Sequence, residues 1–225
     1  RNVRNLGARP SGEAKGANGS NASEDDRAGP CKKESRSKTI VTFGGTLDGN
    51  QRFTAVRADP VQLTQQGMHA WMQRLLNRAE RVGATGEIPV AAVLLDQAGR
   101  CIGHGSNRRE THRDPLGHAE LMALRQGAWL LGDWRMNHCT LLVTLEPCPM
   151  CAGALVQARV GQVIFAARDR KRGGLGSTIN LADHHSAHHH MRVVGGVMEE
   201  EASLQLASWF RQRRRSPGES EEAPT

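Results

Sequence analysis

The sequence has 225 residues, enough for one domain with a sizeable core, and a formal net charge of +7. It contains no apolar run near the ~20 residues that a transmembrane helix needs, so we expect no membrane-spanning segment. The five cysteines are an odd number without disulfide-like spacing, which indicates a reducing compartment and a cytoplasmic location.

The first 60 residues differ from the rest, because Gly, Ser, Asn, Arg and Pro dominate and the apolar clusters are short. Such a composition cannot offset the entropy of folding, so residues 1–60 are predicted to form a disordered, basic, low-complexity extension. A transit peptide is disfavoured, because transit peptides are poor in acidic residues and residues 24–26 are Glu-Asp-Asp. Residues 61–215 are predicted to form the folded domain, and residues 216–225 a disordered acidic tip.

Within residues 61–215, helical and strand patterns alternate. Apolar residues at helical spacing between Met68 and Val82 predict a first helix that ends at Gly83. Residues 89–96 are apolar and short enough for a buried strand, and the turn at residues 97–99 predicts a hairpin with a second strand at residues 101–102.

The later elements are, in chain order, a helix from His118, a strand at 141–145, a helix opened by Pro147, strands at 162–166 and 191–195, and a helix at 199–214. This alternation predicts an α/β fold whose sheet is covered by helices on both faces. In such folds the functional residues lie at the turns from strand to helix.

Two short stretches carry metal-ligand side chains: His118-Ala119-Glu120 and Pro147-Cys148-Pro149-Met150-Cys151. A neutral imidazole and two thiolates suit Zn²⁺, and three protein ligands leave a fourth position open for water, as in catalytic zinc sites. If Pro147 opens a helix, both sulfurs lie on the same face of its first turn, where the helix dipole favours thiolates. The pattern predicts a catalytic zinc site held by His118, Cys148 and Cys151.

Two other interpretations of the cysteine pair remain open. A structural zinc site closed by four cysteines is excluded, because the sequence has no second C-x-x-C, but other structural sites are not. A redox pair would use Cys148 and Cys151 and leave His118 and Glu120 without a role. The joint pattern H-x-E followed by P-C-x-x-C is typical of zinc-dependent nucleobase deaminases and favours catalysis.

Four stretches resemble the bacterial tRNA-specific adenosine deaminases: DPLGHAELMALR at 114–125, VTLEPCPMCAGA at 143–154, FAARD at 165–169 and WFRQRR at 209–214. The first two indicate only the wider cytidine deaminase-like superfamily, and the last two point to its tRNA branch. The resemblance implies a three-layer α/β/α fold with a mixed five-stranded sheet. It also implies a homodimer that uses zinc to convert adenosine to inosine at the wobble position of a tRNA anticodon.

The resemblance also implies roles for individual side chains. Glu120 is expected to move protons during hydrolysis, a task that suits a carboxylate next to a metal site. The amide of Asn107 is expected to contact the target nucleoside, and Asp169 the ribose. Pro89 and Ala119 are expected to line the pocket through their backbone and shape.

Two basic clusters indicate a partner that carries phosphates. Their members are Arg168, Arg170, Lys171 and Arg172 in one cluster, and Arg211, Arg213 and Arg214 in the other. An anticodon loop already presents unstacked bases, so it is a favourable substrate for an enzyme that must reach a base edge. Arginines near helix ends also act as dipole partners, which is the alternative for each of them.

Two other functions are compatible with these residues. The same zinc site and glutamate would serve a cytosine, cytidylate or guanine deaminase. A catalytically silent RNA-binding subunit is the other alternative, and the intact Glu120 disfavours it. The histidine-rich stretch from His184 to His190 is not expected in this family; it is predicted to be a solvated loop, although consecutive histidines can bind adventitious metal.

Overall fold

Side chains of the interior strand β1 (Ala91–Leu95) face two different apolar layers. Ala92 and Leu94 pack into one buried cluster, whereas Ala91, Val93 and Leu95 pack into another. Successive side chains of a strand point to opposite faces, so this strand must be covered on both sides. The computed structural model describes residues 59–215, and all of its strands belong to one sheet.

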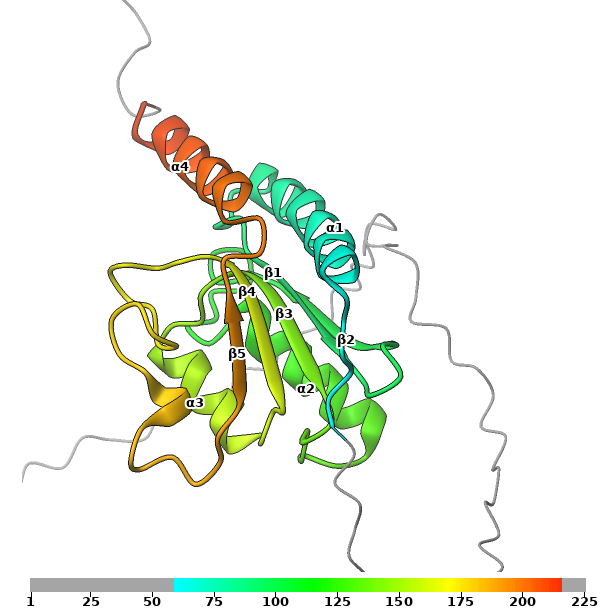
Figure 1. The fold of residues 1–225 in the computed structure, drawn as a ribbon. Coiled ribbons are helices and arrows are strands. Elements are labelled where there is room, and N and C mark those ends of the chain that lie inside the picture. Colours follow the sequence, from blue (N-terminus) through cyan, green and yellow to red (C-terminus); the bar gives the residue numbers. More distant parts are fainter. Residues whose placement is uncertain (1–58, 216–225) are drawn as a thin grey trace, which may run out of the picture. The chain divides into compact units, whose positions relative to one another are not determined.

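The sheet has five strands in the order β2-β1-β3-β4-β5 (Figure 1). The other strands are β2 (Cys101–Ser106), β3 (Thr140–Leu145), β4 (Gln162–Ala167) and β5 (Arg192–Gly195). Strand β1 runs antiparallel to both β2 and β3, whereas β4 is parallel to β3 and to β5. The predicted mixed sheet is therefore confirmed.

Two pairs of helices cover the two faces of the sheet (Figure 1). On one face, α2 (Ala119–Leu131) and α3 (Pro149–Gln157) supply side chains to the cluster around Leu94. On the other, α1 (Gln65–Ala84) and α4 (Glu199–Arg215) supply side chains to the cluster around Val93. The fold is the predicted three-layer α/β/α arrangement.

The local sequence explains where several helices begin and end. Thr64 caps α1, because its hydroxyl accepts a hydrogen bond from the N–H of Gly67 at 3.1 Å. The α2 helix ends at Gly132, which adopts the left-handed conformation at φ 67° that favours glycine. Three acidic residues begin α4, where they interact favourably with the helix dipole.

The structure differs from the sequence-based expectation at three elements. Helix α3 begins at Pro149 rather than Pro147, because Cys148 is the extended N-cap and Pro149 occupies the first turn. Strand β2 continues to Ser106, well past the predicted pair of residues. A short 3₁₀ helix at Leu181–Asp183 was not predicted.

Glycines explain both the missed length of β2 and the position of α2. Gly103 and Gly105 have low strand propensity, so the strand pattern fades at these residues. A Cβ added at Gly103 or Gly105 would overlap with the carbonyl oxygen of Ala123 or Ala119, respectively. The two glycines therefore let the backbone of α2 lie directly on β2, and this close packing fixes the start of α2.

Gly105→Ala is expected to lower the free energy of unfolding by about 1–3 kcal/mol, the usual effect of overpacking a core. The new methyl group would push against the backbone of α2 rather than against a flexible side chain. Gly67→Ala is the matched control, because its added Cβ meets nothing closer than 3.4 Å. Urea denaturation of both variants tests this, and equal stabilities would contradict the close-packing argument.

The predictions for the chain ends lie outside the described residues, apart from residues 59 and 60. Between residues 59 and 215, no helix is long and apolar enough to cross a membrane. The four cysteines of this range, Cys101, Cys139, Cys148 and Cys151, do not form disulfide bonds with one another.

Candidate metal centre and substrate pocket

The starts of α2 and α3 meet and bring three ligand side chains together. His118 is the N-cap of α2, Cys148 is the N-cap of α3, and Cys151 lies in the first turn of α3. The Nδ1 of His118 is 3.4 Å from the sulfur of Cys151 and 3.8 Å from that of Cys148. In the described part of the chain, these three residues form the one cluster of His, Cys, Asp or Glu that could hold a metal ion.

These separations fit zinc. Ordinary Zn–S and Zn–N bond lengths at tetrahedral angles place a sulfur and a nitrogen ligand about 3.6 Å apart. The three ligand atoms all lie within 4.8 Å of one another, so one ion can reach them all. The donor set of one imidazole and two sulfurs also selects zinc over magnesium or calcium, which prefer oxygen.

The two sulfurs share a hydrogen bond that polarises them. The Cys151 thiol, with a further contribution from His118, lowers the pKa of Cys148 to about 4. The same hydrogen bond, together with burial, raises the pKa of Cys151 above its ordinary value. A metal cation would displace the shared proton, because both sulfurs coordinate as thiolates. Zinc binding by Cys148 and Cys151 would therefore release the proton that the two sulfurs share.

Glu120 lies beside this cluster without belonging to it. It is in the first turn of α2 and lines the same pocket as His118, but it is not one of the clustered ligands. Only 4% of its surface is exposed, and burial raises the pKa of Glu120. A carboxylate whose pKa is raised by burial holds a proton more readily than an exposed one, which suits a group that takes up and releases protons.

The pocket at the metal cluster contains most of the predicted substrate residues. Asn107, Ala119 and Asp169 all line it, together with Arg172 from the first basic cluster. The sequence did not point to the other lining residues, which are Ile88, Val90, Arg109 and Leu145. Apolar strand ends and a single arginine give no distinctive pattern, so only the fold could place them at a site.

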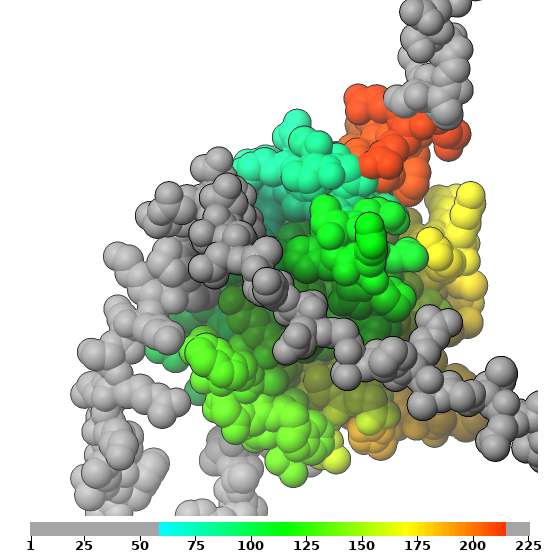
Figure 2. All heavy atoms as spheres, turned by 180° about the vertical axis from the view of Figure 1, so that it is seen from behind, coloured from blue at the N-terminus to red at the C-terminus, as the bar shows by residue number. Residues whose placement is uncertain are grey.

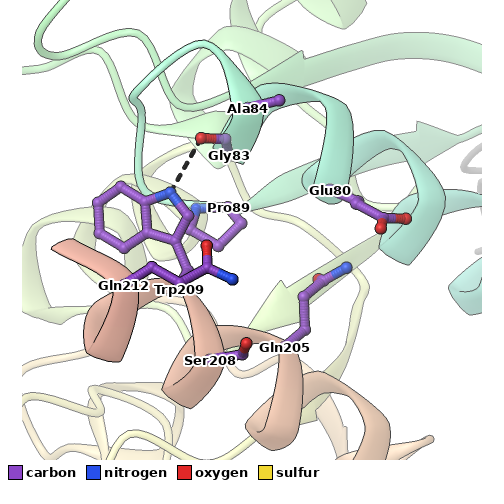
Figure 3. A pocket seen from close by; sticks show the side chains of 8 residues that line it. All are labelled: Glu80, Gly83, Ala84, Pro89, Gln205, Ser208, Trp209 and Gln212. Atoms are coloured by element: carbon purple, nitrogen blue, oxygen red, sulfur yellow. Dashed lines mark hydrogen bonds between the residues drawn. The ribbon is translucent and has the colours of Figure 1, made fainter. Parts of the chain in front are cut away.

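Pro89 lines a pocket other than the one at the metal cluster. Its neighbours Ile88 and Val90 line the metal pocket, but Pro89 lines a separate pocket of about 450 Å³ between α1 and α4 (Figure 3). The indole of Trp209 lies against Pro89 there and donates a hydrogen bond to the carbonyl of Gly83 at 2.9 Å. This larger pocket holds no metal-ligand cluster, so chemistry rather than size identifies the site. The predicted contact of Pro89 with substrate stays a prediction about its backbone.

A buried glutamate missed by the sequence analysis organises the segment that carries Asp169. Glu146, 2% exposed, accepts hydrogen bonds from the backbone N–H groups of Asp169, Leu175 and Ser177. Asp169 in turn accepts from the N–H groups of Lys171 and Arg172, both at 3.0 Å. The position of Asp169 is therefore fixed from both sides. The sequence alone did not predict this role, because Glu146 is a single acidic residue next to the cysteine motif and belongs to no further pattern.

The segments that carry the two basic clusters, after β4 (yellow) and at the end of α4 (red), are both visible in the view of Figure 2. Arg170, Lys171, Arg211 and Arg214 are exposed.

Two of the arginines also have partners within the chain. The Nε of Arg168 is 3.8 Å from a carboxylate oxygen of Glu199. The guanidinium of Arg213 stacks on Trp209 and donates a hydrogen bond to the carbonyl of Gly86. Arg213 therefore also fastens α4 to the end of α1.

The histidine-rich stretch does not form a metal site in the described residues. His189 bonds to the carbonyl of Val160 at 2.8 Å, and His190 lies 3.5 Å from Asp183. None of these histidines belongs to the one candidate metal cluster within residues 59–215. The stretch is a loop, as predicted.

Fold and site together define a class of protein. Residues 65–167 match the family model of the cytidine and deoxycytidylate deaminase zinc-binding region. That span contains all three clustered ligands and Glu120. The chain is therefore a zinc-dependent deaminase in fold and in site, and zinc is its cofactor.

Comparison with related proteins identifies the branch of the deaminases to which the chain belongs. The tRNA-specific adenosine deaminase of Haemophilus influenzae is 43% identical over 143 residues, which cover 64% of this chain and 83% of the relative. That of Bacillus subtilis is 41% identical over 145 residues, 64% of this chain and 89% of the relative. A solved structure from work on A-to-I editing by tRNA:A34 deaminases has a TM-score of 0.58 at 34% identity, covering 60% of this chain and 98% of its own. The chain belongs to the tRNA-specific adenosine deaminase family.

Proposed function

We propose that the protein hydrolytically deaminates adenosine to inosine at the wobble position of a tRNA anticodon. The observation that carries this proposal is the convergence of His118, Cys148 and Cys151 beside a buried Glu120, in a pocket that Asn107 and Asp169 also line. Family membership supplies the substrate class. The deaminase domain is residues 61–215.

The proposed chemistry needs a water molecule, a proton carrier and a departing amino group. When bound by His118, Cys148 and Cys151, zinc supplies the acidity that makes water a nucleophile at neutral pH. Glu120 accepts the proton of the attacking water and delivers protons to the purine ring nitrogen and to the leaving amino group. Oxygen adds at C6, the C6–N bond breaks, and the products are inosine and ammonia.

Substrate contacts follow from the pocket walls. Asn107 contacts the target nucleoside through its amide, Asp169 contacts the ribose, and Ala119 shapes the pocket next to Glu120. Arg172 also lines the pocket, and we propose that it contacts the phosphate of the same nucleotide. Because an anticodon loop already displays its bases, little unstacking is needed for the adenine to enter.

The basic residues are proposed to contact the RNA backbone. All of them are exposed: Arg168, Arg170, Lys171 and Arg172 after β4, and Arg211, Arg213 and Arg214 in α4. Arg168 and Arg213 also have intramolecular partners, so they contribute to RNA binding with part of their donor groups. Such contacts make binding dependent on salt concentration.

A homodimer and a cytoplasmic location complete the proposal. Several large apolar side chains are exposed at the end of α2 and just beyond it, including Trp129, which is 72% exposed, Leu131 and Trp134. Exposed apolar groups of this size are typical of protein interfaces. Light scattering of the purified full chain is expected to give the mass of a dimer, and a monomer at micromolar concentration would contradict this part of the proposal.

The direct test is incubation of the zinc-loaded protein with an anticodon stem-loop that carries adenosine at the wobble position. Mass spectrometry is expected to detect inosine in the stem-loop and no turnover of free adenosine, cytidine or guanine. Turnover of a free base or nucleoside alone would assign the chain a different substrate. No product with any substrate would favour a silent RNA-binding subunit.

A further inference from the structure

A buried carboxylate lies directly behind one wall of the substrate pocket. Glu87, in the segment between α1 and β1, has only 1% of its surface exposed. One of its carboxylate oxygens accepts a hydrogen bond from Nδ2 of Asn107 at 3.1 Å. The other accepts from the backbone N–H and the hydroxyl of Thr111, at 2.8 and 2.9 Å.

Glu87 is the acceptor in each of these hydrogen bonds. Burial raises the pKa of Glu87, but the bonds donated by Thr111 and by the backbone of Glu110 and Arg109 outweigh burial, so its pKa lies below the ordinary value. An ionised carboxylate has no proton to donate. Its partner on Asn107 must therefore be the NH₂ group, which settles the orientation of that amide.

This orientation matters because an amide has different groups on its two sides. With one N–H of Asn107 bound by Glu87, the Oδ1 and the second N–H remain for other partners, and Asn107 lines the pocket. A site built to hydrogen-bond a substrate discriminates strongly when donors and acceptors match, and loses that match when an amide is reversed. Glu87 itself does not line the pocket, so its effect on substrate passes through neighbours that do, and Asn107 is the lining residue whose side chain it binds.

We propose that Glu87 is a positioning residue for substrate recognition, which holds the Asn107 amide in one orientation and thereby sets the hydrogen-bonding groups that face the target nucleoside. The inference rests on the proposed function, in which Asn107 contacts that nucleoside. The bonds to Thr111 serve the same end, because they hold the segment after β2 against Glu87. The buried acid is thus part of the recognition apparatus and not only of the core.

Glu87→Gln tests the proposal with little change in shape. A glutamine can keep an acceptor oxygen toward Thr111 only by pointing its NH₂ at the NH₂ of Asn107, and this conflict is relieved when the Asn107 amide reverses. We expect kcat/KM on the stem-loop to fall by about 10- to 100-fold, the scale of effects seen when a reacting group is misplaced. Zinc content and melting temperature are expected to stay near those of the unaltered protein.

A double-mutant cycle separates positioning from a structural role. If Glu87 acts through Asn107, adding Glu87→Gln to Asn107→Ala causes less than a twofold further loss, and both single variants change the same kinetic parameter, kcat or KM. Fully additive losses would overturn the proposal. Glu110→Gln is the matched control, because Glu110 is an exposed acid in the same segment, and its activity is expected to stay within about twofold.

A measurement on the unaltered protein covers the case in which Glu87→Gln does not fold. In a ¹⁵N NMR spectrum, the side-chain amide protons of Asn107 are expected to show one shifted proton protected from exchange. Two protons at the shifts of an exposed asparagine amide, both exchanging rapidly with solvent, would overturn the proposal. This readout needs no turnover, so it distinguishes failure of the positioning role from failure of the proposed deaminase activity, which the stem-loop assay of the unaltered protein reports.

Discussion

Glu120→Gln protein is expected to bind zinc normally and to lose at least ~10²-fold in the rate of inosine formation, the lower end of what general acid–base catalysis contributes. The substitution keeps the size of a side chain that is almost fully buried in the first turn of α2. It removes a carboxyl group that lines the pocket and whose pKa is raised by burial. Single-turnover assays with metal analysis of the same sample check both parts of the prediction.

Glu200→Gln provides the matched control for this variant. Glu200 is also an acid in the first turn of a helix, but it is exposed and belongs to α4. Its replacement is expected to change the rate by less than about twofold, as for most surface substitutions. Near-normal turnover by zinc-loaded Glu120→Gln protein would remove Glu120 from the mechanism and leave proton transfer to another group or to solvent.

The sequence was sufficient for the parts of the fold that rest on strong periodicity. The buried strand around Leu94, the helix from Met68 to Val82 and the final helix all appear where the pattern predicted them. The metal ligands were also predictable, because a histidine and two cysteines at helix starts have few other uses in combination. Each of these features is encoded in a short stretch of sequence, and the two ligand stretches are recognisable separately.

Features that depend on contacts between distant segments could not be predicted in this way. Glu87 and Glu146 read as ordinary surface acids, yet each is buried because backbone groups far along the chain converge on it. Pro89 was expected to line the substrate pocket through its backbone and shape, and the sequence did not indicate that it also lines a separate pocket together with Trp209 of α4. Neither the sequence around Pro89 nor that around Trp209 indicates that the two residues meet.

The glycines of β2 are a second case in which contacts between distant segments, and not the local sequence, decide the structure. Their low strand propensity predicted an early end to the strand, whereas the absence of a Cβ is what allows α2 to pack there. Tertiary contact thus overrides local preference at the element that presents His118 and Glu120 to the pocket. Strand propensity therefore misplaces the end of β2, because glycine is needed at these positions for the close approach of α2.

Cys151→Ala is expected to abolish both zinc binding and measurable deamination. Removal of Cys151 leaves two ligands, His118 and Cys148, and a structural or catalytic zinc site needs at least three from the protein. The measurement is zinc per chain by mass spectrometry of the metal, together with inosine formation. Chelation of the unaltered protein is expected to have the same effect on activity, and added zinc is expected to restore it only when Cys151 is present.

Cys139→Ala is the control that separates ligand loss from cysteine loss. Cys139 is buried outside the metal cluster, and burial raises its pKa to about 11, so it remains a thiol at neutral pH. Its replacement is expected to preserve zinc and activity.

Circular dichroism of the chelated protein distinguishes a catalytic zinc site from a structural one. Because two apolar clusters enclose the sheet without help from the metal, the helices are expected to persist. Unfolding on chelation would instead make the zinc structural, as in domains that fold only with metal.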